Sequence, residues 1–94
     1  MNERYLDTKA RLAKRGLLML AERVAARWFV SLRELLGGAR HKAVAAARRH
    51  LWNLMRDTLA LSYPAIGRLT GHDHTTVMAG IKLRQAELAR EYAA

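Results

Sequence analysis

The chain has 94 residues, of which 51% are apolar, with a single proline and no cysteine. This length predicts one small domain and the apolar content argues against disorder, while the lack of cysteine excludes a disulfide scaffold, a thiol nucleophile and a cysteine zinc site. The formal net charge of +9 predicts a polyanionic partner, either nucleic acid or an anionic membrane surface.

Neither a membrane span nor a secretion signal is expected. No apolar run approaches the roughly 20 residues that a membrane span needs. The first ten residues, MNERYLDTKA, are charged and lack the apolar core of a signal peptide. We therefore expect the mature protein to start here and to act in the cytoplasm. The absence of cysteine fits that compartment.

The first predicted helix is amphipathic. Apolar residues recur at steps of three and four, which draws a largely buried stripe down one face through Leu6, Ala10, Ala13, Leu17, Leu20, Val24 and Trp28. Gly16 interrupts this run and weakens the case for one continuous helix. Ser31 followed by Glu34 then forms a capping box that opens a short helix through Leu36, which the glycine pair 37–38 ends.

The next predicted helix covers roughly residues 41–59 and is strongly basic. Its inward side is expected to hold Val44, Leu51, Met55 and Thr58. Its other face gathers Lys42, Arg49 and Arg56, with Arg48 at the border. Residues 37–59 carry five Lys or Arg against one acid, which makes this segment the densest positive region of the chain.

Two further helices complete the pattern. Ser62 is expected to cap a short helix with Pro64 in its first turn, which Gly71 ends. Asp73 can cap the last helix. Its buried side is predicted to hold Val77, Ile81, Leu88 and Tyr92, and its opposite side Thr75, Ala79 and Lys82. No strand signal appears, so we predict an all-α, compact bundle of about five helices with a helix-turn-helix at about residues 62–84.

Two stretches carry a resemblance to a known family. SYPAIGRLTGHDHTTVMAGIK, together with the upstream VAARWFVSLRELLGGARHKAVAAARRHLWNLMRDTLALS, resembles the C-terminal DNA-binding domain of the bacterial replication initiator DnaA over roughly residues 17–92. The resemblance implies a Trp-repressor-like helix-turn-helix. We therefore expect a single domain over residues 1–94, with 1–16 as an N-terminal helical extension and 17–94 as the DnaA-like region.

The resemblance also implies roles for individual residues. The side chains expected to read bases in the major groove are Asp73, His74, Thr75 and Thr76. Arg40 matches an arginine that enters the minor groove, and Arg48 and Arg56 match basic residues of the central helix. The positions expected to contact phosphates are Lys42, Arg48, Arg49, Arg56, His72 and Lys82. Physical chemistry agrees, because helix N-termini present free N–H groups to phosphates and short polar side chains there can reach base edges.

The chain departs from the family's pattern at three places and lacks one module. The turn Gly71-His72-Asp73 is one residue shorter than the family's Gly-Gly-Arg-Asp. His72 replaces a phosphate-gripping arginine, so a positive charge is lost near neutral pH. Ala65 replaces an acidic residue, and the recognised DNA sequence is therefore open. No GxxxxGK[ST] motif occurs, so we expect no ATPase module and no complete replication initiator.

Plainer interpretations stand beside these. His72 and His74 form an H-x-H pair, but zinc needs further ligands, and no elbow or oxyanion motif supports a Ser/His/Asp relay. Asp73 can serve as a helix cap, as a base reader or as both. The arginines of residues 48–56 can form an ordinary solvated face, and Trp52 is expected in or beside the core. We predict no enzymatic activity, no metal, no cofactor and no small-molecule substrate.

The predicted function is sequence-specific binding of double-stranded DNA, as a transcription regulator of the phage or mobile-element type. One alternative is a replication or origin-control factor that binds initiator-like boxes. Another is an interaction module whose N-terminal helix recruits RNA polymerase or another protein. Membrane binding is not expected, because the stripe of the N-terminal helix is largely alanine and buries weakly in lipid.

Overall fold

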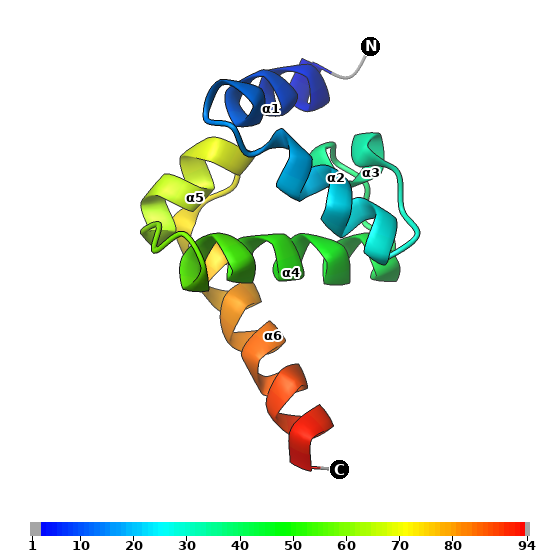
Figure 1. Ribbon diagram of the computed structural model, residues 1–94, viewed down its shortest axis with the longest axis vertical. Coiled ribbons are helices and arrows are strands. Elements are labelled where there is room, and N and C mark those ends of the chain that lie inside the picture. The colour runs from blue at the N-terminus through cyan, green and yellow to red at the C-terminus, as the bar shows by residue number, and fades with distance from the viewer. Residues whose placement is uncertain (1–2, 94) are drawn as a thin grey trace.

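The computed structural model describes residues 3–93, which contain six α-helices and no strand (Figure 1). These helices are α1 (Glu3–Lys14), α2 (Leu18–Arg27), α3 (Leu32–Leu36), α4 (Lys42–Asp57), α5 (Tyr63–Thr70) and α6 (His74–Ala93). The predicted all-α fold is confirmed. There are six helices where about five were predicted, because the first predicted helix is divided into α1 and α2.

Gly16 causes this division. Its φ of +72° lies in the left-handed region, which favours glycine because a side chain there is strained. The N–H of Gly16 donates to the carbonyl of Ala13 (3.1 Å), and the N–H of Leu17 donates to the carbonyl of Leu12 (2.8 Å). These two bonds form a Schellman motif, which satisfies the last carbonyls of α1 and turns the chain.

The predicted apolar stripe is wrong in α1. Three of its expected members are exposed, namely Leu6, Ala10 and Ala13. The side chains of α1 that are buried are instead Tyr5, Thr8 and Leu12. The stripe holds in α2, where Val24 is buried and Leu17, Leu20 and Trp28 pack against the core. One helical phase cannot describe both helices, because the turn at Gly16 changes the direction of the chain.

The central helix α4 organises the core. It contacts α2, α3, α5 and α6, while α1 lies across α3 and α5 on the far side of the bundle (Figure 1). Side chains from all six helices meet in one apolar cluster, whose completely buried members include Leu12, Leu35, Leu51, Met55, Ile66, Val77 and Ile81. The core therefore joins α1 to the rest of the molecule.

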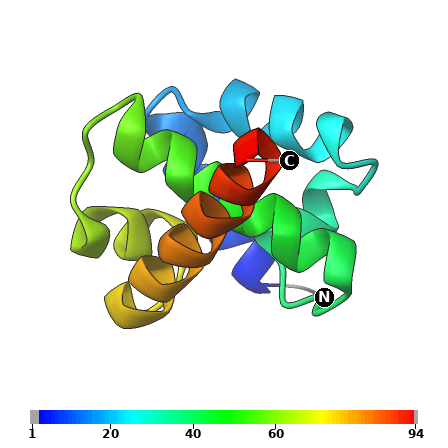
Figure 2. The same cartoon turned by 90° about the horizontal axis from the view of Figure 1, so that it is seen from below.

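The last helix, α6, crosses α4 and then projects away from the bundle (Figures 1 and 2). Val77 and Ile81 are fully buried, as predicted, and Leu88 is half-buried. Tyr92 was predicted to face inward but is 89% exposed, because the projecting end of α6 has no helix beneath it. Thr58 is also exposed, since α4 ends at Asp57 and Thr58 is its C-cap.

The predicted helix starts are confirmed at two serines. The Ser31 hydroxyl accepts the N–H of Glu34 (3.0 Å), and the Glu34 carboxylate accepts the N–H of Ser31 (2.9 Å), which completes the capping box. The Ser62 hydroxyl accepts the N–H of Ala65 (3.2 Å), with Pro64 in the first turn of α5.

Over the described part of the chain, none of the helices combines the length and apolarity that crossing a bilayer requires.

Candidate nucleic-acid interface

Helices α5 and α6 are joined by a three-residue turn that begins at Gly71. The φ of Gly71 is +76°, and its N–H donates to the carbonyl of Gly67 (2.8 Å). The N–H of His72 donates to the same carbonyl (3.0 Å). These bonds close the end of α5 and turn the chain directly into α6, which starts at His74.

The turn packs tightly against α5 at Gly67. A Cβ atom on this glycine would lie 2.5 Å from the carbonyl oxygen of His72, a backbone atom that cannot move aside on its own. This close approach explains why the sequence motif has glycine at position 67. The glycine lets the turn approach α5 and fixes where α6 begins.

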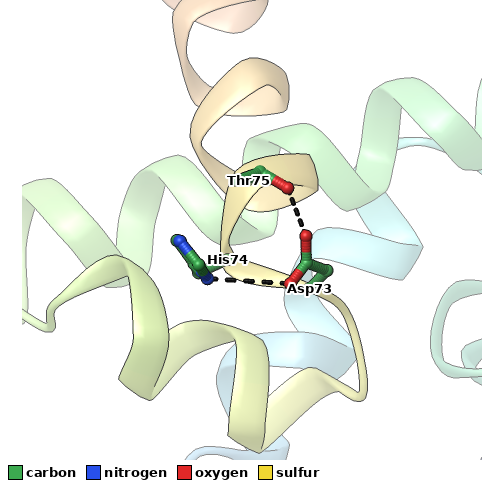
Figure 3. A network of polar contacts seen from close by, with 3 residues as sticks. All are labelled: Asp73, His74 and Thr75. Carbon is green, nitrogen blue, oxygen red and sulfur yellow. Dashed lines mark hydrogen bonds and ion pairs between the residues drawn. The ribbon is translucent and has the colours of Figure 1, made fainter.

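The start of α6 presents a group of exposed polar side chains, Asp73, His74, Thr75 and Thr76. Figure 3 shows the first three of them. The hydroxyl of Thr75 donates to the Asp73 carboxylate, and Nδ1 of His74 lies 3.6 Å from the other carboxylate oxygen. The Thr75 hydroxyl lowers the pKa of Asp73, and the nearby charge of His74 lowers it further. The four predicted base-reading residues thus lie together on the surface at a helix N-terminus, where free N–H groups favour anions.

His72 is set apart from this group. It is half-buried, and its ring stands edge-on to Trp52, with centroids 5.0 Å apart. Burial and the charges of Arg4 and Arg48 lower the pKa of His72 to about 4. The ring is therefore neutral at pH 7, as the sequence predicted, and carries no charge toward a phosphate.

An arginine from α1 occupies the space beside His72. Nη2 of Arg4 lies 2.8 Å from Nε2 of His72 and donates to the carbonyl of Gly71 (2.9 Å). A second arginine of α1, Arg11, donates to the carbonyl of Leu69 (3.4 Å). Sequence reasoning missed both residues. Arg4 and His72 are 68 positions apart, and no local pattern joins them.

Arg48 lies inside the fold, where it is only 9% exposed. Its guanidinium donates to the carbonyls of Glu34 (3.0 Å), Leu35 (3.1 Å), Ala39 (3.2 Å) and Gly37 (3.2 Å). Burial lowers the pKa of this group. Four of the five N–H donors that an arginine offers are used here. The side chain thus closes the end of α3 and anchors the loop that leads to Arg40.

The other predicted cationic residues occupy different environments. Arg40, Lys42 and Lys82 are exposed. Arg49 is half-buried and lies 3.5 Å from the Glu87 carboxylate. Arg56 donates to the carbonyl of Leu61 (3.1 Å) and stacks over Tyr63. In Figure 2 the start of α6 and the loop before α4 lie toward the same lower edge of the view. One face of the molecule therefore carries both.

Two hollows adjoin the start of α6. One, of about 480 Å³, lies between α5 and the turn, and Arg68 and His74 are among its lining residues. Sequence reasoning did not single out Arg68, which is exposed on α5. The other, of about 320 Å³, lies between α4 and α6 and is lined partly by Thr76 and Trp52. Trp52 is only 4% exposed, which agrees with its expected place in the core.

Gly80 allows α6 to lie closely on Trp52. A Cβ atom at this position would be 2.6 Å from the indole ring. Because Trp52 also supports the ring of His72, the indole holds both α6 and the turn in place. The position of the exposed polar group thus depends on packing beneath it.

The histidines are separated from one another by their contacts. Nδ1 of His50 accepts the indole N–H of Trp28 (2.8 Å), His72 faces Trp52 and Arg4, and His74 faces Asp73. Within residues 3–93, no group of three or more His, Cys, Asp or Glu side chains is arranged to hold a metal ion.

Two helices joined by a glycine turn, with polar side chains exposed at the start of the second, define the helix-turn-helix class of DNA-binding domains. The family described as "Bacterial dnaA protein helix-turn-helix" matches residues 19–83. The chain belongs to this family, and it is accordingly a DNA-binding domain of the DnaA type. Helix α1 precedes the matched residues.

Similar proteins carry the description "Chromosomal replication initiator protein DnaA". The one from Mycobacteroides abscessus is 40% identical over 68 residues, which is 71% of this chain and 14% of that protein. The one from Thermomicrobium roseum is 42% identical over 60 residues, 63% of this chain and 13% of that protein. The one from Neisseria meningitidis serogroup C is 36% identical over 81 residues, 79% of this chain and 16% of that protein.

The chain thus spans a small part of the length of each of these relatives. No solved structure matches it significantly.

Proposed function

We propose that this protein binds duplex DNA at a specific sequence and regulates transcription, as a regulator of the phage or mobile-element type. The observation that carries the proposal is the exposed group of residues 73–76 at the start of α6, held by the turn at Gly71. A binding role, not an enzymatic one, is proposed, with the protein located in the cytoplasm on the nucleoid.

In this proposal the start of α6 enters the major groove. His74 can donate or accept a hydrogen bond at a base edge, and the threonines can bond or place a methyl group against thymine. Asp73 can accept from a cytosine amine. Since the Asp73 carboxylate already accepts the Thr75 hydroxyl, we assign it to orienting Thr75 as well as to reading a base.

Arg40 is proposed to enter the minor groove beside the major-groove site. It is exposed in the loop that precedes α4, and Arg48 ties the backbone of that loop to α3. A narrow A·T-rich minor groove attracts arginine through its enhanced negative potential. Arg48 therefore contributes by positioning the loop, which revises the direct phosphate contact expected from the sequence.

Phosphate contacts are proposed for the exposed cations around this face. They are Lys42, Arg56, Arg68 and Lys82, with Arg49 at the edge of the groove between α4 and α6. Such contacts position the protein without reading sequence.

Arg4 is proposed to supply the charge that His72 lacks. It is exposed, touches the Gly71 carbonyl and the His72 ring, and lies at the turn where the family's pattern has an arginine. The neutral ring of His72 accepts its hydrogen bond and so orients the guanidinium. In this proposal the N-terminal extension of residues 1–16 completes the DNA-binding surface of the region 17–94.

The test is selection of bound duplexes from a random pool, followed by affinity measurements at several salt concentrations. We expect one enriched motif, and an affinity that falls steeply with salt by about 0.9 in log–log slope for each phosphate contact. A bound pool with no enriched motif, or an affinity that does not depend on salt, would contradict the proposal.

A second proposed function is control of a replication origin. The similarity to replication initiator proteins favours it, because a domain of the same type can compete for initiator-like boxes. It predicts that the enriched motif matches the box bound by the host initiator and that the two proteins displace each other. An unrelated motif would favour transcription control. Recruitment of RNA polymerase or another protein through α1 is a further alternative, tested by pull-down with and without residues 1–16.

A further inference from the structure

A basic groove lies away from the start of α6, between α2, α4 and the second half of α6. It encloses about 370 Å³ and is lined by Leu20, Arg23, Val24, Arg27, His50, Asn53, Leu54, Arg84 and Leu88. Its α6 residues, Arg84 and Leu88, follow the residues of α6 that line the hollow beside Thr76. The groove therefore belongs to the projecting half of α6 and not to its start.

Within the described residues, the arginines of this groove form no ion pair. Among residues 3–93, no carboxylate lies within 4 Å of the charged nitrogens of Arg23, Arg27 or Arg84. One carboxylate, that of Glu91, lines an adjoining hollow together with Arg27 and Arg84. The groove thus gathers several positive charges that are not paired, and an anion could bind there.

Arg84 is the most deeply buried of these unpaired cations. The residue is only 7% exposed, its Nε has no hydrogen-bond partner, and its guanidinium lies 5.5 Å from the centre of the Trp28 ring. A buried donor without a partner destabilises a fold, and a buried cation does so more. A carboxylate from another molecule that accepts a hydrogen bond from the guanidinium of Arg84 would offset the cost of burying this cation.

The floor of the groove is apolar and narrows the choice of ligand. Leu20, Val24, Leu54 and Leu88 supply it, and Leu20 and Leu54 remain partly exposed. A small anion would leave this floor wet. The outside of a DNA duplex offers phosphates but no apolar side chain to fill it. A peptide segment with carboxylates and leucine-like side chains on one face satisfies both the cations and the floor.

We propose that this groove binds an acidic amphipathic segment of a partner protein. Carboxylates of the segment pair with Arg23, Arg27 and Arg84, and its apolar side chains cover the floor. The site is separate from the DNA surface, so the partner and DNA bind at the same time. This inference does not depend on which DNA sequence α6 reads.

The experiment is NMR titration of the whole chain with a synthetic helical peptide of leucine, glutamate and alanine that places leucine and glutamate on one face. We expect shifts at the Trp28 indole, His50 and the end of α6, with none at residues 73–76. Arg27→Glu and Arg23→Glu, both at exposed positions, should each weaken binding by about tenfold. The matched control Arg15→Glu, which is also exposed and is not among the residues that line the groove, should change it by less than about twofold.

Several results would overturn the proposal. Equal losses for Arg15→Glu and Arg27→Glu would mean non-specific attraction to a basic protein. Equal shifts with succinate alone would assign the groove to a small anion. Shifts that depend on protein concentration without peptide would assign it to a second copy of the chain. Loss of DNA affinity in Arg27→Glu equal to that in the peptide assay would make the groove part of the DNA surface.

Discussion

At the scale of single residues, the structure divides the polar and cationic side chains by what they already contact. Residues 73–76 are exposed at a helix start and remain accessible to a partner. Arg48 is committed to four carbonyls of its own chain, and His72 to Trp52 and Arg4. Residues of similar chemistry thus have different expected consequences when they are replaced.

Replacement of His74 or Thr75 by alanine should impair recognition and leave the fold intact. Both side chains are exposed, so the melting temperature should stay near that of the wild type. Affinity for the selected duplex should fall by about 1–3 kcal/mol, while affinity for a scrambled duplex changes little. Titrations of both duplexes at one salt concentration measure this. Equal losses on the two would show that these residues position the protein without reading bases.

Arg40→Ala and Arg48→Ala should have distinct effects. Arg40 is exposed, so its loss should leave stability unchanged and weaken binding most where A·T pairs flank the site. Arg48 is buried and holds four carbonyls, so its loss should lower the free energy of unfolding by about 2–4 kcal/mol. Urea denaturation and binding to duplexes with altered flanks separate the two. Unchanged stability in Arg48→Ala would contradict its anchoring role.

Arg4→Ala should weaken binding to every duplex, because the proposed contact is with a phosphate. The salt slope should fall by about 0.9, a change that a purely structural role for Arg4 would not produce. His72→Arg in the Arg4→Ala background should restore the slope, since it places a cation at the same turn. Arg15→Ala serves as control, because it removes an equal charge from the end of the same helical extension. An unchanged slope in Arg4→Ala would exclude the contact even where wild-type binding is sequence-specific.

At the scale of secondary structure elements, glycines set how closely the helices approach. Gly16 ends α1, Gly71 ends α5, and Gly80 lets α6 lie on Trp52. Gly67 lets the turn between the two helices lie close against α5. The angle between α5 and α6, on which entry into the major groove of DNA depends, is therefore set by positions that have no side chain.

Gly67→Ala should damage the helix-turn-helix by forcing the turn away from α5. Its Cβ would lie 2.5 Å from the His72 carbonyl, and crowding of this kind costs about 1–3 kcal/mol. Gly38→Ala is the matched control, because nothing lies within 4 Å of a Cβ at that position. The melting temperature and the affinity for the selected duplex should both fall for Gly67→Ala and stay unchanged for Gly38→Ala. Equal stability of the two variants would contradict this account of the turn.

At the scale of the whole molecule, stability should depend on pH through His72. Burial and neighbouring cations lower its pKa from 6.5 to about 4, so the folded state favours the neutral ring. The stabilisation is fully present above about pH 6.5 and is lost as the pH falls toward 4, by about 1–2 kcal/mol once solvent screening of the half-buried ring is included. Burial lowers the pKa of His50 as well, which adds a loss of the same sign.

Urea denaturation of the wild type and of His72→Gln between pH 7 and pH 4.5 isolates the His72 contribution. The free energy of unfolding should fall less steeply with acid in the variant, and the contribution of His50 cancels in the difference. Parallel pH profiles would show that His72 titrates normally in the folded protein.

The sequence by itself determined the helical class, the capped starts of α3 and α5, and the helix-turn-helix. These features depend on neighbours within a few positions, such as Ser31 with Glu34 or Ser62 before Pro64, and local spacing records them. It also placed residues 73–76 together at a helix start, where the structure exposes them.

The tertiary structure alone decided which cations remain available. Arg48 is buried by carbonyls of α3 and the following loop, and Arg4 reaches His72 from the other end of the chain. Tyr92 is exposed because α6 outruns the bundle, although its spacing is that of a buried stripe. Helical periodicity reports which residues share a face, but only the packing of one helix against another determines whether that face is covered.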